Sequence, residues 1–356
     1  MTDAGSTGSQ GSTCWTGPGG SGSSTDPAGR TPVVWVPRPI DDDVVASLRA
    51  WADVRLGWGD DATDWSDVAA EGEGVLLRTA RVDGAMMREA PRLRVVARHG
   101  VGLDTVDVDT AAELGVPGPT PPAANSRSVA GRAVPLLMVT GRGLGAAWSG
   151  GRGTGDPGAD GSGTVPTRAS LVGRELHGAT LGLLGFGRIA RLVADTARDG
   201  LGMRVVAHDP HLSDDAVRAA GAEPADLDAL LAASDALSVH VPLTPTTVGL
   251  IGARELALLR PGAVVVNTSR GGVVDEEALV ASLDAGHLAG AGLDVTTVEP
   301  LPADHPLRGR SDVVLTPHVG GQTREAMARV GHEAAEHLRH VLCAPGQDPG
   351  ARKPVS

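Results

Sequence analysis

The sequence is poor in aromatic residues and in cysteine. Its 356 residues include six Trp, one Phe and no Tyr, so Val, Leu and Ala must build the hydrophobic core. The two cysteines, Cys14 and Cys343, stand near opposite ends of the chain and form no CxxC motif. This usage excludes a disulfide scaffold and a cysteine-based zinc site. It predicts a cytoplasmic protein, in a reducing compartment, that holds no metal.

Long apolar runs and an excess of positive charge are absent as well. No apolar run reaches the ~18 residues that a membrane span requires. The formal net charge is -12, opposite in sign to the clustered positive charge with which proteins bind a nucleic-acid backbone. Neither a membrane nor a nucleic acid is therefore an expected partner. The length of the chain predicts two domains.

Two segments contain almost nothing apolar. Residues 1–31 are rich in Gly, Ser and Thr and cannot bury enough surface to offset the entropy of ordering, which predicts a disordered tail. This tail has no apolar stretch of the secretory-signal type. Residues 149–166, SGGRGTGDPGADGSGTVP, predict a flexible Gly-rich segment in the middle of the chain.

Elsewhere, strand-like and helix-like segments alternate. Apolar strands are predicted at 33–36, 74–78 and 93–98, together with a helix at 41–52 whose leading acidic triplet suits the helix dipole. A second series begins with the strand at 180. It continues with strands at 205–209, 236–241, 263–269, 290–295 and 313–318. Such a repeat of βα units predicts an α/β fold with parallel sheets, the second of them doubly wound.

The stretch TLGLLGFGRIARLVADTA, residues 180–197, contains a G-x-G-x-x-A pattern. With 50 Gly in the chain, the pattern alone arises easily by chance, so its context has to decide. A strand precedes Gly185, a helix follows Ala190, and the next strand ends in Asp209. In this arrangement Gly185 makes the tight turn, Gly187 lets the backbone approach a pyrophosphate, and Asp209 accepts hydrogen bonds from the adenosine ribose. The stretch therefore predicts a dinucleotide site, and the carboxylate favours NAD over NADP.

Several ordered motifs extend this pattern over about 33–343. They are ARHGVGLDTVDV (97–108), PPAANSRSVA (121–130), SVHVPLTPTT (238–247), VVNTSRGGVVDEEAL (265–279), GAGLDVTTVEPLP (290–302) and LTPHVGGQT (315–323). With these motifs the chain resembles the D-isomer-specific 2-hydroxyacid dehydrogenase family, which includes phosphoglycerate dehydrogenases and glyoxylate or hydroxypyruvate reductases. The resemblance implies a doubly wound NAD-binding domain and a smaller, flavodoxin-like substrate domain.

The resemblance also implies a catalytic trio of Arg270, Glu299 and His318. Chemistry explains these residue types, because removing hydride from a 2-hydroxy acid leaves an alcohol proton that needs a base near neutral pH, and His supplies one. A carboxylate on the other ring nitrogen fixes the tautomer. An arginine fork can hold the substrate carboxylate.

Further contacts follow from the resemblance alone. Arg188 and Ile189 are expected to face the pyrophosphate through their backbones. The nicotinamide half of NAD is expected to meet Val241, Thr268, Ser269, Arg270, Asp294, His318, Gly320 and Gly321. Substrate contacts are expected from Arg78, Val101, Gly102 and Arg270, the first three in the smaller domain. No motif fixes which small 2-hydroxy or 2-oxo acid is the substrate.

The resemblance divides the chain into a discontinuous substrate domain, 32–129 plus 319–345, and an NAD-binding domain, 130–318. It also implies a homodimer. Gly131, where the family usually has Glu, Pro135 within a predicted helix, and the segment 149–166 depart from the family in the region that contacts a second subunit in relatives. No regulatory domain is expected after 345. Two alternatives stay open, namely an NAD-responsive corepressor-type binding protein on this fold and a catalytically impaired relative.

Overall fold

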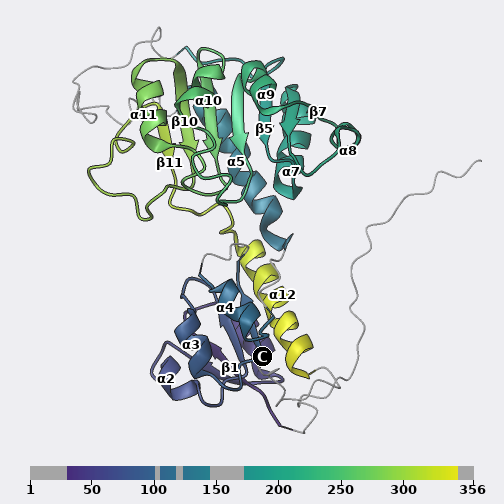
Figure 1. Cartoon of the computed structure of the whole chain (residues 1–356), viewed down its shortest axis with the longest axis vertical. Helices are drawn as coiled ribbons and strands as arrows, with labels where there is room; N and C mark the ends of the chain where they lie inside the picture. Colours follow the sequence, from purple (N-terminus) through teal and green to yellow (C-terminus); the bar gives the residue numbers. More distant parts are fainter. Residues whose placement is uncertain (1–29, 101–104, 118–122, 145–171, 344–356) are drawn as a thin grey trace, which may run out of the picture.

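The computed structural model describes residues 30–100, 105–117, 123–144 and 172–343. Two lobes are visible, one built from the earlier part of the chain together with the C-terminal helix, and one from the part of the chain between them (Figure 1). The predicted disordered tail, apart from its last residues, and the predicted flexible segment 149–166 lie outside the described residues.

The smaller lobe contains a four-stranded sheet in the order β2-β1-β3-β4, with every strand pair parallel. Its strands are β1 (Val33–Val36), β2 (Asp53–Leu56), β3 (Gly74–Leu77) and β4 (Val95–Arg98). The helices are α1 (Asp42–Arg49), α2 (Trp65–Val68), α3 (Gly84–Glu89), α4 (Val108–Glu113) and the C-terminal α12 (Arg324–Cys343). The strand order is that of flavodoxin-like sheets, as the resemblance implied.

The larger lobe contains a seven-stranded parallel sheet in the order β11-β10-β9-β8-β5-β6-β7. Its strands are β5 (Thr180–Leu184), β6 (Arg204–His208), β7 (Glu223–Pro224), β8 (Ala236–Val239), β9 (Ala263–Asn267), β10 (Leu288–Leu293) and β11 (Val313–Leu315). From β5 the chain runs outward through β6 and β7, then returns to place β8 on the other side of β5, so the order reverses between β5 and β8. This reversal is the Rossmann switch point beyond which ligands bind. The predicted α/β, doubly wound fold is confirmed.

Helices cover both faces of the larger sheet. One apolar core contains residues of α5 (Ser126–Gly141), α7 (Arg188–Asp195) and α8 (Asp214–Ala219). The other face packs against α9 (Leu227–Ala233), α10 (Ala253–Leu258) and α11 (Glu276–Asp284). A 3₁₀ turn, Ala123–Asn125, precedes α5, and a π-helical turn, Thr196–Gly200, extends α7. Helix α5 continues through Pro135, whose side chain is exposed.

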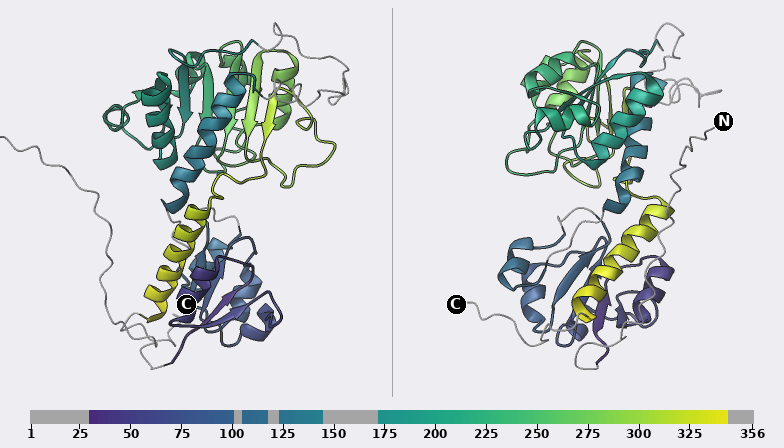
Figure 2. Two further views of the ribbon diagram at one scale, coloured as in Figure 1. Left: turned by 180° about the vertical axis from the view of Figure 1, so that it is seen from behind. Right: turned by 90° about the vertical axis from the view of Figure 1, so that its right-hand side faces the viewer.

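The chain passes between the lobes where the N-terminal ends of α5 and α12 meet (Figure 2). The Ser128 and Thr323 hydroxyls lie 2.9 Å apart, and the Arg329 guanidinium donates to the Ala124 carbonyl at 3.1 Å. These bonds join α5 and the turn before it to α12, the helix that packs on the smaller lobe. The predicted domain boundaries at 129/130 and 318/319 fall in this region and stay predictions.

In the described part of the chain, no helix has the length and apolar character that crossing a bilayer would require.

Candidate functional site

Most of the predicted cofactor residues stand where strands of the larger sheet end. Gly185, Asp209 and Asp294 directly follow β5, β6 and β10, and Thr268 directly follows β9. Val241 comes two residues after the end of β8. Because parallel strands share one carboxyl edge, the fold gathers these residues at the edge beside the switch point.

The glycine turn is shaped for a close approach of another molecule. Gly185 has a φ of +85°, and a Cβ there would lie 2.9 Å from Val241 Cγ1 and 3.0 Å from the His240 carbonyl oxygen. A Cβ on Gly187 would meet nothing within 4 Å. Gly187 also precedes α7 without a side-chain cap, so no N-cap side chain satisfies the first-turn N–H groups of Arg188 and Ile189. These features fit a bound pyrophosphate.

Asp209 supports this turn while keeping room for a ligand. Its Oδ2 accepts the Phe186 N–H at 2.9 Å, and its Oδ1 accepts the His211 N–H at 3.0 Å. A carboxylate offers about four acceptor positions, so two remain for ribose hydroxyls. Its half-buried position leaves it accessible at the strand tip.

The Thr268–Arg270 segment is held by a residue that sequence reasoning missed. Asn267, buried at the end of β9, accepts the Ser269 N–H and hydroxyl through Oδ1 and donates to the Arg270 carbonyl at 2.8 Å. Arg270 Nη1 donates to the Ser269 carbonyl at 2.7 Å. The buried Thr268 hydroxyl has no hydrogen-bond partner within the described residues. A buried polar atom without a partner is costly, so a ligand donor or acceptor beside Thr268 would relieve it.

Glu299 and His318 form a hydrogen-bonded pair, with His318 Nδ1 2.8 Å from Glu299 Oε2. Their side chains are 39% and 46% exposed, so a substrate can reach the imidazole. The Arg270 loop contacts the Glu299 loop directly, because a Cβ on Gly271 would lie 2.0 Å from the Thr296 carbonyl oxygen. The fold therefore brings the loops of all three predicted trio residues together.

Asp294 fixes the segment that carries His318. The His318 N–H donates to the Asp294 carbonyl at 2.7 Å, and the Asp294 carboxylate accepts the N–H groups of Val319 at 3.0 Å and Gly320 at 2.7 Å. It also accepts the Thr316 hydroxyl. These bonds hold His318 at a φ of +52°, a backbone conformation that non-glycine residues adopt infrequently. The expected contact between Asp294 and a carboxamide stays a prediction.

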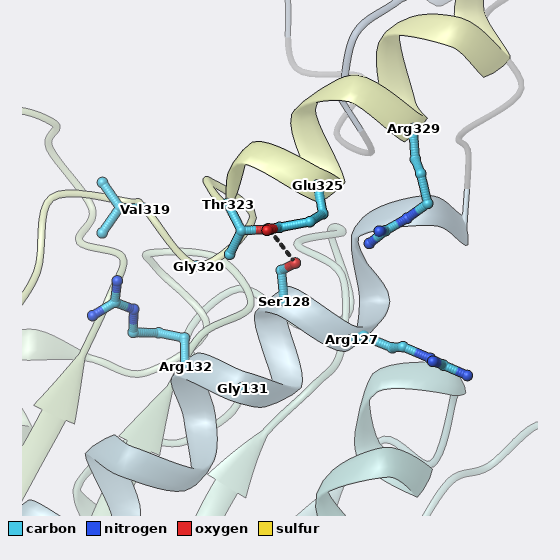
Figure 3. Close-up of a pocket in the computed structure, with 9 residues that line it drawn as sticks. All are labelled: Arg127, Ser128, Gly131, Arg132, Val319, Gly320, Thr323, Glu325 and Arg329. Atoms are coloured by element: carbon cyan, nitrogen blue, oxygen red, sulfur yellow. Dashed lines mark hydrogen bonds between the residues drawn. The ribbon is translucent and has the colours of Figure 1, made fainter.

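The other predicted residues are less closely tied to this cluster. Gly321 packs against the start of α5, since a Cβ there would lie 2.9 Å from Asn125 Nδ2. Arg78 is half-buried just after β3 in the smaller lobe, and Val101 and Gly102 lie outside the described residues. A cavity of about 350 Å³ lies where α5 and α12 meet, and Figure 3 shows it lined by Ser128, Arg132 and Gly320 among others. The trio residues are not part of its lining.

Burial sets the protonation state of one histidine beside the site. Burial lowers the pKa of His240, beside the glycine turn, to about 4, so this ring is neutral near pH 7. Its Nε2 lies 2.9 Å from the Ser238 hydroxyl. Among the described residues, no group of three His, Cys, Asp or Glu side chains is placed to hold a metal ion.

Comparison with known proteins decides which family this site belongs to. The sequence model for the NAD-binding domain of D-isomer-specific 2-hydroxyacid dehydrogenases matches residues 160–320. An (S)-sulfolactate dehydrogenase from Chromohalobacter salexigens is 39% identical over 311 residues, covering 85% of this chain and 96% of that protein. The chain belongs to the D-isomer-specific 2-hydroxyacid dehydrogenase family. Its larger lobe is accordingly an NAD-binding domain, and the predicted resemblance and cofactor are confirmed.

Other members of this family are similar over comparable stretches. A D-3-phosphoglycerate dehydrogenase from Mycobacterium bovis is 40% identical over 312 residues, which are 87% of this chain but only 57% of that protein. The crystal structure of the TT0316 protein from Thermus thermophilus superposes with a TM-score of 0.76 at 34% identity, covering 89% of this chain and 98% of that one. This dehydrogenase-family chain thus spans little more than half of its mycobacterial relative.

Proposed function

We propose that the protein is an NAD-dependent dehydrogenase that interconverts a small D-2-hydroxy acid and the corresponding 2-oxo acid. The observation that carries the proposal is the His318–Glu299 pair at 2.8 Å, adjoining the Arg270 loop beyond the carboxyl edge of an NAD-binding sheet. Relatives support the same class, since one is named for the oxidation of 3-phosphoglycerate and another for that of sulfolactate.

The pair gives His318 a defined role as the acid and base. An ionised Glu299 can only accept, so Nδ1 of His318 carries the proton of the 2.8 Å hydrogen bond. Nε2 then has the free lone pair and takes the hydroxyl proton during oxidation. When protonated, it returns that proton to the carbonyl oxygen during reduction. Glu299 stabilises the imidazolium that forms between these events.

The other residues orient and bind. Arg270 holds the substrate carboxylate through its planar guanidinium, and Arg78 of the smaller lobe assists it. Bound NAD would supply the hydride acceptor, or NADH the hydride donor. Gly187 and the first turn of α7 would hold its pyrophosphate, Asp209 its ribose, and Val241 and Thr268 its nicotinamide half.

This proposal is tested by assaying the purified protein for NADH oxidation with a panel of 2-oxo acids. We expect turnover of at least one acid and a loss of roughly 10²- to 10⁴-fold in His318→Ala, the usual contribution of a positioned acid–base group. The limbs of the pH–rate profiles should run oppositely in the two directions, oxidation rising and reduction falling with pH. NADH binding without turnover of any acid would instead favour the corepressor-type alternative.

We further propose that the protein acts in the cytoplasm as a homodimer. The support for self-association is the apolar part of α5 that the described structure leaves exposed, where Met138 is 40% exposed and lies one turn beyond Pro135. Sedimentation velocity should show a dimer for the unmodified chain and a monomer for Met138→Asp. A monomer in both cases would refute the dimer.

A further inference from the structure

The loop that carries Glu299 makes few hydrogen bonds within itself. Residues 296–300 follow β10 without regular structure, and the side chain of Val298 is 57% exposed. Within the loop, Thr296 donates its N–H to Glu299 Oε1 at 3.2 Å and its hydroxyl to the Val298 carbonyl at 2.9 Å. The carboxylate that faces His318 therefore depends on where the backbone at Thr296 and Thr297 is fixed.

A carboxylate from another element fixes that backbone. Glu276 Oε1 accepts both the Thr297 N–H at 2.6 Å and the Thr297 hydroxyl at 2.9 Å. Glu276 lies in the first turn of α11, and its side chain is only 13% exposed. An acidic residue in a first turn is commonly explained by the helix dipole. The helix dipole is sufficient to explain Glu277, which is exposed in the same turn. Glu276, in contrast, points to the Glu299 loop.

The second oxygen of Glu276 faces His305. The Leu307 N–H donates to His305 Nδ1 at 3.3 Å, so the ring proton of the neutral imidazole is on Nε2. His305 Nε2 lies 3.3 Å from Glu276 Oε2. The Glu276 carboxylate is thereby held on one side by His305 and holds Thr297 on the other.

Gly271 bounds the loop on the side of Arg270. A Cβ there would lie 2.0 Å from the Thr296 carbonyl oxygen and 2.5 Å from the Thr297 nitrogen. The Thr296–Thr297 peptide thus contacts the Arg270 loop, and its own N–H, that of Thr297, is bound by Glu276 of α11. A shift of this peptide would move Glu299 relative to His318.

We propose that Glu276 is a positioning residue that holds Glu299 against His318 through Thr297. This inference rests on the proposed function, because it assigns Glu276 a role in the acid–base pair of that reaction. Glu276 touches neither substrate nor cofactor in this account. Its effect is transmitted by the backbone of the Glu299 loop.

Three variants of the full chain test the role by comparing kcat with the KM for NADH. Glu276→Ala removes the acceptor of both Thr297 bonds, and we expect kcat to fall roughly 10- to 100-fold because the pair is misplaced. Glu276→Gln keeps one oxygen that accepts both Thr297 bonds but turns its NH2 group to the Nε2–H of His305, so it should restore only part of kcat. Glu277→Ala is the matched control and should match the unmodified enzyme.

The outcomes separate this inference from the proposed function. If Glu299→Gln lowers kcat and Glu276→Ala does not, Glu276 is no positioning residue. If Glu299→Gln leaves kcat unchanged, the pairing within the proposed function fails. The KM for NADH should stay within roughly twofold in Glu276→Ala, because the pyrophosphate site is untouched. Should Glu276→Ala not fold, Thr297→Ala loses only the hydroxyl bond to Glu276 and should lower kcat by a smaller factor. An unchanged kcat in Thr297→Ala would overturn the proposal.

Discussion

Asp209 serves the glycine turn and, in the proposed function, the ribose as well. A 2′-phosphate beside it would meet a carboxylate already engaged by the Phe186 and His211 N–H groups. We therefore expect kcat/KM for NADH to exceed that for NADPH by roughly 10- to 100-fold, the worth of a charge-assisted hydrogen bond. Asp209→Asn keeps an acceptor for the Phe186 N–H, so it should reduce the preference for NADH over NADPH without unfolding the turn. The double variant Asp209→Asn with Pro210→Arg should reverse that preference. Equal use of both cofactors by the unmodified protein would contradict the assignment.

Arg270 offers a second test at the scale of single residues. Arg270→Lys keeps the positive charge but loses the planar fork, so the bidentate grip on a carboxylate is lost. We expect kcat/KM for the 2-oxo acid to fall about 10²-fold, from both a higher KM and a lower kcat. NADH affinity, followed by fluorescence titration, should hardly change. Full activity of the lysine variant on every accepted acid would show that Arg270 is not the carboxylate clamp.

At the scale of elements, two glycines make a matched comparison. A Cβ on Gly271 would lie 2.0 Å from the Thr296 carbonyl oxygen, and the backbone cannot move far enough to relieve this clash. Gly271→Ala should therefore abolish activity and lower Tm. Gly131 lies within α5 with nothing within 4 Å of a built Cβ, so Gly131→Ala should stabilise the protein by roughly 0.5–1 kcal/mol. Differential scanning calorimetry of both variants checks the pair. A Gly271→Ala protein with normal Tm and activity would refute the close packing of the two loops.

The elements also show where sequence patterns stop being informative. Strands predicted at 236–241 and 263–269 end at Val239 and Asn267, because the residues that follow leave the sheet to form the site. Strand β2 was not predicted, since its sequence DVRL is half-exposed at a sheet edge and lacks an apolar run. The acidic start of the helix predicted at 41–52 was interpreted correctly, as Asp41 caps α1 through the Asp43 N–H at 3.0 Å.

At the scale of the whole molecule, motif order was enough to predict two parallel sheets and the family. Motif order did not predict the residues whose side chains hold the site together. Glu276 and Thr316 act through contacts between loops far apart in sequence, and no local pattern reports which carboxylate of a first turn points inward. Asn267 acts within its own turn, but its sequence does not show that the side chain folds back onto Ser269 and Arg270. Positions at strand ends can thus be predicted from sequence, whereas their supporting contacts require the fold.

Two histidines with lowered pKa values make the fold less stable in acid. Burial lowers the pKa of His240 to about 4 and also lowers that of His99, which is 4% exposed with a partnerless Nε2 within the described residues. The unfolded chain has ordinary histidines with a pKa of about 6.5, so between these values it binds more protons than the folded chain. The free energy of unfolding must therefore fall as the pH drops below about 7, and His240 alone should contribute a loss of roughly 1.4 kcal/mol between pH 7.5 and 5.5.

Replacing His240 with Asn removes the titrating ring but keeps a polar partner for Ser238. We expect the fall in Tm between pH 7.5 and 5.5 to be smaller by a few degrees in this variant than in the unmodified protein. His332→Asn, on the exposed side of α12, is the matched control and should leave the pH dependence unchanged. Because the comparison uses differences between two pH values, any constant cost of the substitution cancels. Parallel Tm curves for His240→Asn and the unmodified protein would mean that His240 is protonated in the fold, against the burial that lowers its pKa.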